Sequence, residues 1–176
     1  MSESISRRYF VFGLTGLSAI PLARGAWSAA APPGPAIDNQ VTIENFSAAG
    51  KSLGTSRVEK VVKTDGEWQA MLSPLAYRVA RRAGTEMAFT GEYDKNHADG
   101  IYHCVCCDTA LYDSKTKFES GTGWPSFWQP ISVINVVKSS DRSLGMERDA
   151  ISCRRCDAHL GHVFDDGPRP TGLRIA

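Results

Sequence analysis

The 176-residue sequence lacks the features that mark several broad classes of protein. It has almost no net charge, because 20 lysines and arginines are balanced by 19 aspartates and glutamates. No stretch gathers basic residues among aromatic ones, so we expect no binding of nucleic acid. Internal repeats are absent apart from two Cys-x-x-Cys pairs. The hydrophobic share of 42% is sufficient for a folded core, which excludes general disorder.

The first 31 residues differ in composition from the rest. Two adjacent arginines, Arg7 and Arg8, precede an apolar run from Tyr9 to Leu22, and small residues follow up to Ala30 and Ala31. A basic start, a short apolar centre and a small-residue end are the parts of a bacterial export signal, and the paired arginines resemble the twin-arginine type. We therefore predict an export signal over residues 1–31, cleaved near its end, and a periplasmic protein.

A permanent membrane anchor is not expected from this segment. Its apolar run is short for a bilayer and contains Gly13, Gly16 and Pro21. An uncleaved membrane-tethering helix and a mitochondrial-type presequence remain as alternatives, since Phe12-Gly13 stands where twin-arginine signals usually have a lysine.

The rest of the chain divides into a linker region and one domain. Residues 32–63 start with the stiff segment Pro32–Pro35 and contain the alternating pattern of a short strand at Val41–Phe46. Residues 64–176 are predicted to form the domain. The 16 glycines and nine prolines of the chain are typical of a loop-rich β protein.

Two short helices are predicted where this domain begins. Thr64 and Glu67 have the spacing of a capping box. Ser73 followed by Pro74 is a second helix start, and Gly84 is expected to end that helix.

Short apolar runs broken by Gly, Pro, Asn and Asp dominate the chain from residue 85 onward. They lie at Ile101–Tyr102, Ala110–Tyr112, Ile131–Val137 and Val163–Phe164. Such runs favour antiparallel strands joined by long loops. The fold class predicted is mainly β, with antiparallel sheets and short N-terminal helices.

The two Cys-x-x-Cys pairs are the strongest chemical signal. Cys104 and Cys107 form the first pair, Cys153 and Cys156 the second. A spacing of two residues lets one tight turn aim both sulfurs at one ion, and two such turns complete a tetrahedron. We predict one closed structural zinc site. Two disulfides, which export would favour, and a rubredoxin-like iron site are the alternatives.

Cys106 is the one cysteine outside these pairs. A buried small side chain is the preferred interpretation, because free cysteine is usually buried. A redox-active thiol is the alternative.

Two further stretches have the composition of a site. In Phe118–Trp128, glycines and a proline surround Trp124, which could form one wall of an apolar pocket or belong to an aromatic core cluster. His159 and His162 follow the second cysteine pair directly. They could act as general acids or metal ligands, or be structural histidines. The cysteine pair beside them strengthens the functional interpretation, because a metal site there would anchor the segment that carries both histidines.

Over roughly residues 64–176 the chain resembles the B-type methionine sulfoxide reductases, which act on the R epimer. The resemblance rests on the cysteine pairs and on several longer motifs, which are Arg82–Glu86, Thr90–Tyr93, Gly100–Cys104, Lys117–Phe118, Ser120–Phe127, Ala158–Phe164, Asp166–Pro168 and Thr171–Arg174. It implies a zinc-binding fold of two antiparallel sheets. It also implies that the four paired cysteines ligate the zinc.

The resemblance implies a chemistry and partners as well. A thiolate attacks the sulfoxide of oxidised methionine in proteins or peptides, and a thioredoxin-like reductant restores the thiol. Trp124 would form the methyl-binding wall, while His162 and His159 would orient water or protons at the departing oxygen. Asp166 would fix the loop beside them, and Arg174 would favour the thiolate. We expect a monomer.

The sequence departs from this family where the nucleophile is expected. The reactive cysteine normally stands two residues after the arginine that matches Arg174, and here that residue is Ala176. The strand with an asparagine that usually follows is missing, so the domain is predicted to be truncated or altered at its C-terminus. Thr122 occupies the place of a resolving cysteine, and Ala150 a place where an acid is commoner.

These departures leave two classes of function. The first is an exported reductase of methionine-R-sulfoxide whose sequence is truncated or altered at its C-terminus, so that the natural product is active while this chain as written is inactive. The alternative is a catalytically inactive, zinc-stabilised module that binds sulfoxide-containing segments in the Trp124 pocket. A metal-storage or redox-relay role is a more distant third.

Overall fold

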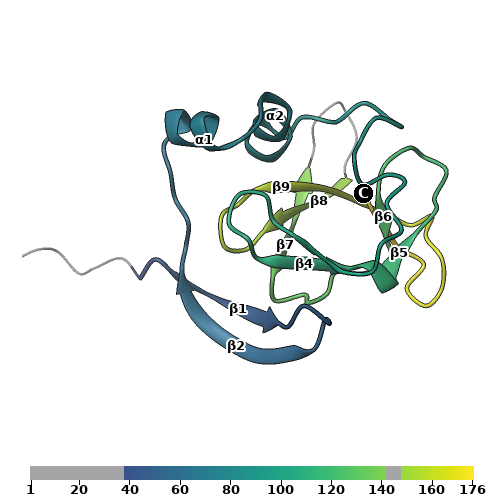
Figure 1. Ribbon diagram of the computed structural model, residues 1–176, viewed down its shortest axis with the longest axis horizontal. Helices are drawn as coiled ribbons and strands as arrows, with labels where there is room; N and C mark the ends of the chain where they lie inside the picture. The colour runs from purple at the N-terminus through teal and green to yellow at the C-terminus, as the bar shows by residue number, and fades with distance from the viewer. Residues whose placement is uncertain (1–37, 142–147) are drawn as a thin grey trace, which may run out of the picture. The chain divides into compact units, whose positions relative to one another are not determined.

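The computed structural model describes residues 38–141 and 148–176, and Ile37–Ala176 forms one unit (Figure 1). The predicted export signal lies outside the described residues. In order, the elements are β1 (Gln40–Phe46), β2 (Ser52–Glu59), α1 (Asp65–Met71), α2 (Pro74–Arg82), β3 (Ile101–His103), β4 (Ala110–Asp113), a 3₁₀ turn (Ser114–Thr116), β5 (Lys117–Phe118), β6 (Ser126–Phe127), β7 (Val136–Asp141), β8 (Arg148–Cys153), β9 (His159–Phe164) and β10 (Arg174–Ile175).

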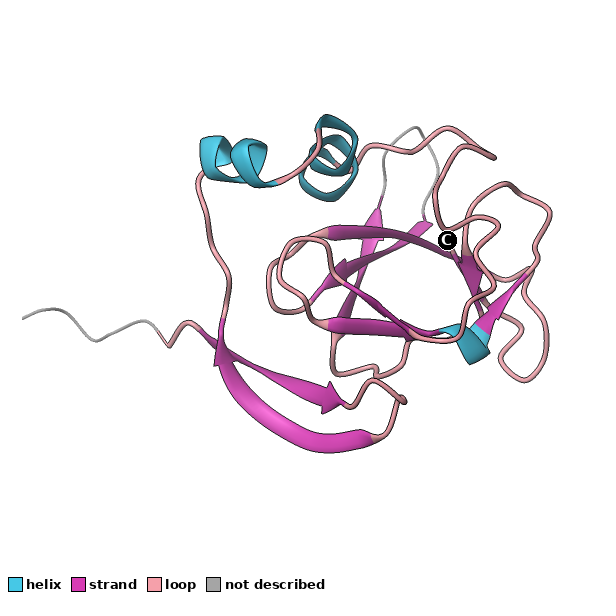
Figure 2. Ribbon diagram, viewed as in Figure 1, coloured by secondary structure: helices cyan, strands magenta, loops and turns pink. Residues whose placement is uncertain are grey.

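The described part is mainly β and antiparallel, as the sequence predicts (Figure 2). One six-stranded sheet has the order β5-β6-β10-β9-β8-β7, and two further ladders pair β1 with β2 and β3 with β4. Loops join most of the strands. No helix in residues 38–141 or 148–176 is long and apolar enough to cross a membrane.

The two helices begin where local sequence chemistry predicts. Thr64 and Glu67 form a complete capping box at α1, and Ser73 caps α2 with a proline in its first turn. The end of α2 differs in detail from the expectation, because the left-handed residue is Ala83 (φ 49°) rather than Gly84. Gly84 is still required, since a Cβ there would lie 2.9 Å from the carbonyl oxygen of Arg78.

Both helices are connected to the second cysteine pair through Trp68 and Arg81. Trp68 of α1 is buried, and the guanidinium of Arg81 lies 4.6 Å from its ring centroid. Arg81 also donates a hydrogen bond of 2.7 Å to the carbonyl of Cys156. This chain of contacts joins the helices to the second cysteine pair.

The predicted strand at Ile131–Val137 is wrong for most of its length, because β7 begins only at Val136. The preceding residues form a turn in which the Ser132 hydroxyl accepts a hydrogen bond from the amide of Ile134. Asn135 follows, fully buried. Its side-chain amide donates to the carbonyls of Glu44 and Ala110, and its oxygen accepts from the amide of Glu44. This polar side chain joins β1 to β4, a task that an apolar strand residue could not perform.

Candidate functional site

The four paired cysteines meet in one cluster. Their sulfur atoms all lie within 4.8 Å of one another, and three of the four residues are buried. The sulfurs of Cys104 and Cys156 are 3.6 Å apart, and those of Cys107 and Cys153 are 3.5 Å apart. Bonds of about 2.3 Å to one tetrahedral ion would place sulfurs roughly 3.8 Å apart. Such a cluster could therefore hold a metal ion, whereas all five cysteines of the chain are free rather than disulfide-bonded.

The two cysteine pairs have the same backbone geometry. In the first, the amide of Asp108 donates to the carbonyl of Cys104 at 2.8 Å; in the second, Asp157 donates to Cys153 at 2.9 Å. Asp108 and Asp157 are both left-handed, with φ of 60° and 57°. Each turn therefore directs two sulfurs to the same side of the chain, and together they supply four ligands.

Cys106 is not one of the four residues that meet in this cluster, although its thiol is close enough to interact with those of Cys104 and Cys156. It is buried and belongs to the hydrophobic core, and it does not line the pocket described below. The interpretation of Cys106 as a buried small side chain agrees with this position.

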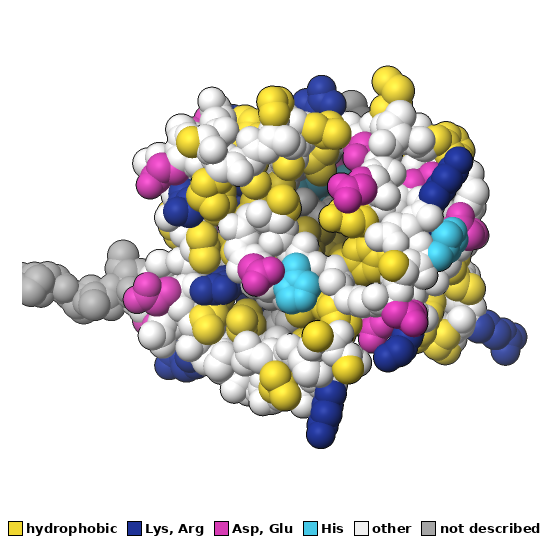
Figure 3. All heavy atoms as spheres, in the orientation of Figure 1, with side chains coloured by type: hydrophobic (Ala, Val, Ile, Leu, Met, Phe, Trp, Pro, Cys, Tyr) yellow, Lys and Arg dark blue, Asp and Glu magenta, His cyan; other side chains and the backbone are white. Residues whose placement is uncertain are grey.

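A pocket of about 450 Å³ opens beside the sheet. Figure 3 shows the hollow on the face viewed, with hydrophobic side chains along its border. Its walls come from the 84–93 segment, from β3, β4, β6, β9 and β10, and from the loop that carries Trp124. Among the sequence-predicted residues, those that line it are Trp124, His159, His162, Arg174, Ala176 and Thr122. Asp166 does not line it.

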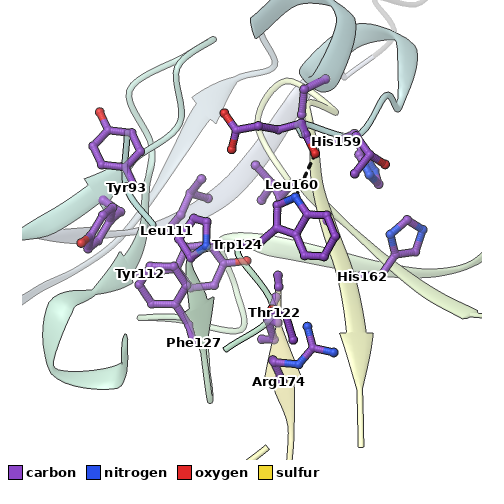
Figure 4. A pocket seen from close by; sticks show the side chains of 18 of the residues that line it. Tyr93, Leu111, Tyr112, Thr122, Trp124, Phe127, His159, Leu160, His162 and Arg174 are labelled. Atoms are coloured by element: carbon purple, nitrogen blue, oxygen red, sulfur yellow. Dashed lines mark hydrogen bonds between the residues drawn. The ribbon is translucent and has the colours of Figure 1, made fainter. Parts of the chain in front are cut away.

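Trp124 stands in the middle of this pocket, between Tyr112 on one side and the two histidines on the other (Figure 4). Its indole nitrogen donates a hydrogen bond of 2.9 Å to the carbonyl of Glu86. The amide of Phe89 donates to the carbonyl of Gly123 at 2.7 Å. Because these two bonds hold the loop to the 84–93 segment, the indole is fixed as a wall.

His159 and His162 both lie on β9. Their ring centroids are 5.1 Å apart, with the rings nearly edge to face. Nε2 of His162 lies 2.8 Å from a carboxylate oxygen of Asp141, and both side chains are mostly buried. His162 therefore presents a ring held by a carboxylate to the pocket.

Arg174 is buried and held from two sides. Its guanidinium donates two hydrogen bonds, of 2.8 and 2.9 Å, to the two carboxylate oxygens of Asp166. It also lies 4.1 Å from the ring centroid of Phe164. Hydrogen bonding from Arg174 lowers the pKa of Asp166 below its ordinary value. Asp166 therefore acts on the pocket through Arg174.

Residue 176 lies on the same face as these groups. Arg174 is paired with Phe164 across the strands, and the backbone of Ala176 exchanges two hydrogen bonds, of 2.8 and 3.1 Å, with that of His162. Because side chains alternate along a strand, Arg174, Ala176, Phe164 and His162 all project to one side. A side chain at position 176 is therefore placed between a guanidinium and an imidazole.

Comparison with known proteins identifies the domain. The profile of the SelR domain matches residues 72–176. Peptide methionine sulfoxide reductase MsrB of Pseudomonas entomophila is 55% identical over 117 residues, which are 66% of this chain and 89% of that protein. The proteins of the same name from Pseudomonas syringae and Pseudomonas putida are 56% and 54% identical over the same shares. This chain belongs to the SelR domain family. The resemblance found in the sequence is thereby confirmed at the level of the family.

Sequence reasoning missed two residues that shape the pocket of this SelR domain. Glu86 acts through its backbone carbonyl, and a carbonyl leaves no mark in a sequence. Asp141 is separated from His162 by 21 positions, and only the register of the sheet brings the two together. An acid near the end of a predicted strand was the one available signal, and many exposed strand ends carry one.

Proposed function

We propose that this domain is built to reduce methionine-R-sulfoxide in proteins and peptides, at the expense of thiols. The observation that carries the proposal is the convergence of Trp124, His162, Arg174 and residue 176 on one pocket. Relatives at about 55% identity that are named peptide methionine sulfoxide reductases support it.

Each group has a task in such a reaction. The Trp124 face accepts the methyl group, and His162 supplies a proton to the sulfoxide oxygen. The buried charge of Arg174 favours a thiolate at position 176. The thiolate sulfur bonds to the sulfoxide sulfur, and the protonated oxygen then passes to the attacking sulfur. Methionine leaves with its sulfur reduced by two electrons, and the thiol has become a sulfenic acid.

A reductant closes the cycle. Two further thiols reduce the sulfenic acid, which releases water and leaves the reductant as a disulfide. We propose a thioredoxin-like dithiol for this task, acting on a monomeric enzyme.

Because residue 176 is alanine, binding of the sulfoxide and its conversion are proposed separately for this chain. A methyl group cannot attack sulfur, so the chain with this residue is proposed to bind the sulfoxide without converting it. That makes the inactive binding module the second candidate function, and Ala176 is the specific observation in its favour.

Exposed hydrophobic residues beside the pocket favour a polypeptide as the substrate. Met87 and Phe89 are 74% and 64% exposed, and both belong to the segment held against the Trp124 loop. Exposed hydrophobic side chains beside a pocket are typical of a surface that binds another chain. They would contact the residues that flank an oxidised methionine.

One substitution tests both halves of the proposal. Ala176→Cys should convert an R-sulfoxide peptide to its methionine form with dithiothreitol, as followed by chromatography, while the S epimer remains. The unaltered chain should bind the R-sulfoxide peptide and give no product. Thr122→Cys is the matched control, because it adds a thiol to another wall of the same pocket and should give no turnover.

Three results would contradict the proposal. Absence of binding by the unaltered chain would contradict the claim that the pocket binds the R-sulfoxide. Lack of turnover by Ala176→Cys would contradict the claim that a thiol at position 176 reduces it. Turnover by the unaltered chain would mean that another thiol, such as Cys106, serves as nucleophile.

We also propose that the cysteine cluster holds structural zinc. Four thiolates around one ion are the donor set of closed zinc sites, and such a site performs no catalysis. Elemental analysis of the purified protein should find about one zinc per chain. Iron in its place would support the rubredoxin-like alternative.

Export to the periplasm is proposed from the first 31 residues alone. Cell fractionation should place the protein outside the cytoplasm, with its N-terminus near residue 31. Replacement of Arg7 and Arg8 by lysine should retain it inside.

A further inference from the structure

We propose that Asp141 is a positioning residue for His162, one that fixes which ring nitrogen serves the pocket. The inference rests on the proposed function, in which His162 supplies a proton. The carboxylate oxygen lies 2.8 Å from Nε2, and the side chains are 23% and 15% exposed. A hydrogen bond at this distance between mostly buried groups is well formed.

The register of three neighbouring strands brings the two side chains to one face. On β7 and β8, Ser139 is paired with Ala150, and on β8 and β9, Ala150 is paired with His162. Paired residues share a face, and Asp141 lies two positions beyond Ser139, so it shares this face too. The contact therefore runs diagonally across the middle strand.

Ala150 makes this crossing possible. Strands two places apart in a sheet are separated by roughly 10 Å, so the Asp141 and His162 side chains must meet above the strand between them. The residue of β8 that lies across from His162 is Ala150. Its methyl group leaves the space that a longer side chain would fill.

The carboxylate decides the tautomer of the ring. An ionised carboxylate only accepts hydrogen bonds, so Nε2 must carry its proton toward Asp141. Nδ1 is then the nitrogen that takes up and releases a proton, and within residues 38–141 and 148–176 it has no hydrogen-bond partner. Because His162 lines the pocket, Nδ1 is the nitrogen available to a sulfoxide oxygen.

The other groups around His162 do not perform this task. His159, on the same strand, offers a ring and not a carboxylate. Asp166 spends both carboxylate oxygens on Arg174. Asp149 directly precedes Ala150 on β8, but its side chain projects to the face of the sheet opposite His162, because side chains alternate along a strand. There it forms an ion pair of 2.7 Å with Lys138.

The tautomer of His162 tests the inference without any turnover. In the full chain labelled with ¹⁵N, the two ring nitrogens should report the form with the proton on Nε2. Asp141→Ala should give a mixture of tautomers, whereas Asp141→Glu should preserve the original form. Asp149→Ala is the matched control, since it removes an acid from the adjacent strand and should leave the ring signals unchanged.

Catalysis supplies the second measurement, in protein that carries Ala176→Cys. A positioned general acid contributes about 10²–10⁴-fold to a rate, and loss of its orientation removes part of this. Adding Asp141→Ala should therefore lower kcat about 10–100-fold with KM nearly unchanged, and Asp141→Glu should restore most of the loss. A purely structural role would lower the melting temperature of both variants and would not separate kcat from KM.

Two outcomes would overturn the inference. One is an unchanged His162 tautomer in Asp141→Ala, and the other is a kcat within about twofold of the parent. Failure of Ala176→Cys to turn over any sulfoxide would instead overturn the proposed function, and the tautomer result would still decide the role of Asp141.

Discussion

Gly161 should be among the least replaceable residues of the domain, because it lets β9 approach residue 176. Its φ is +135°, and a Cβ there would lie 2.2 Å from the carbonyl oxygen of Ala176. The nearest atoms are backbone, so no side chain can move aside. Gly161→Ala must therefore displace the end of the chain.

The cost can be worked out from two contributions. The substitution breaks the two backbone hydrogen bonds between His162 and Ala176, each worth about 1 kcal/mol net. It also forces a non-glycine residue into a strained region of backbone angles, at about 1–3 kcal/mol. We expect a loss of about 3–5 kcal/mol in the free energy of unfolding.

Two other glycines separate these contributions. Gly172 has φ +72° with nothing near its added Cβ, so Gly172→Ala should cost only strain, about 1 kcal/mol. Gly66 lies in α1 with open space around it, so Gly66→Ala should be neutral or slightly stabilising.

Urea unfolding at equilibrium would rank the three variants. Hydrogen exchange at the His162 amide should also become faster in Gly161→Ala, because its acceptor has moved. The reasoning fails if Gly161→Ala costs no more than Gly172→Ala, or if the His162 amide stays protected.

Three further predictions concern the cysteine cluster, the pocket wall and the buried arginine. Chelation, or Cys153→Ser, should lower Tm by at least about 10 °C, whereas Cys106→Ala should have a much smaller effect; an unchanged melt would refute a structural metal. Trp124→Ala should weaken binding of an R-sulfoxide peptide about 10–100-fold by calorimetry without a matching loss of stability, and equal affinity would remove its role as the methyl wall. Because the pKa of Asp166 is lowered by Arg174, this ion pair stabilises the fold above the ordinary carboxyl pKa and its contribution is lost as pH falls through the lowered value. Asp166→Asn should therefore be less stable than the parent at neutral pH, and the two unfolding curves should converge in acid; a difference that persists at pH 2 would contradict the assignment.

Features encoded within a few residues could be predicted from the sequence. The capping box of α1 depends on two side chains three positions apart, and both bonds are present. The cysteine pairs are likewise local turns. That the two pairs meet in one cluster could be predicted because four thiolates are the ligand set of one tetrahedral metal ion.

Features that depend on register could not be predicted. The spacing of Trp68, Met71 and Leu72 places all three on one helical face, yet Met71 is 55% exposed while the other two are buried. Periodicity gives the direction of a face but not its width, which depends on the neighbouring sheet. The Asp141–His162 contact has the same origin, since it crosses two strand pairings that no local pattern records.

The two cysteine pairs explain how distant walls of the pocket come to face each other. Cys107 is followed three residues later by the start of β4, which carries Leu111 and Tyr112 into one wall. Cys156 is followed three residues later by the start of β9, which carries His159 and His162 into the other.

Each strand therefore leaves its turn at the same short distance from the cysteine cluster in which the turns meet. The turns close in the same way, through a hydrogen bond of 2.9 Å from the amide of Cys104 to the carbonyl of Thr109 and an equal one from Cys153 to Ala158. Because both strands start from this cluster, the distance between them is small there and grows with the angle between the strands. The cluster therefore sets the width of the pocket at the end nearest to it. At the far end, the width depends on the pairing of His162 with residue 176, which Gly161 permits. The cysteine cluster and Gly161 thus constrain β9 at its start and in its middle, and His162 follows Gly161 directly.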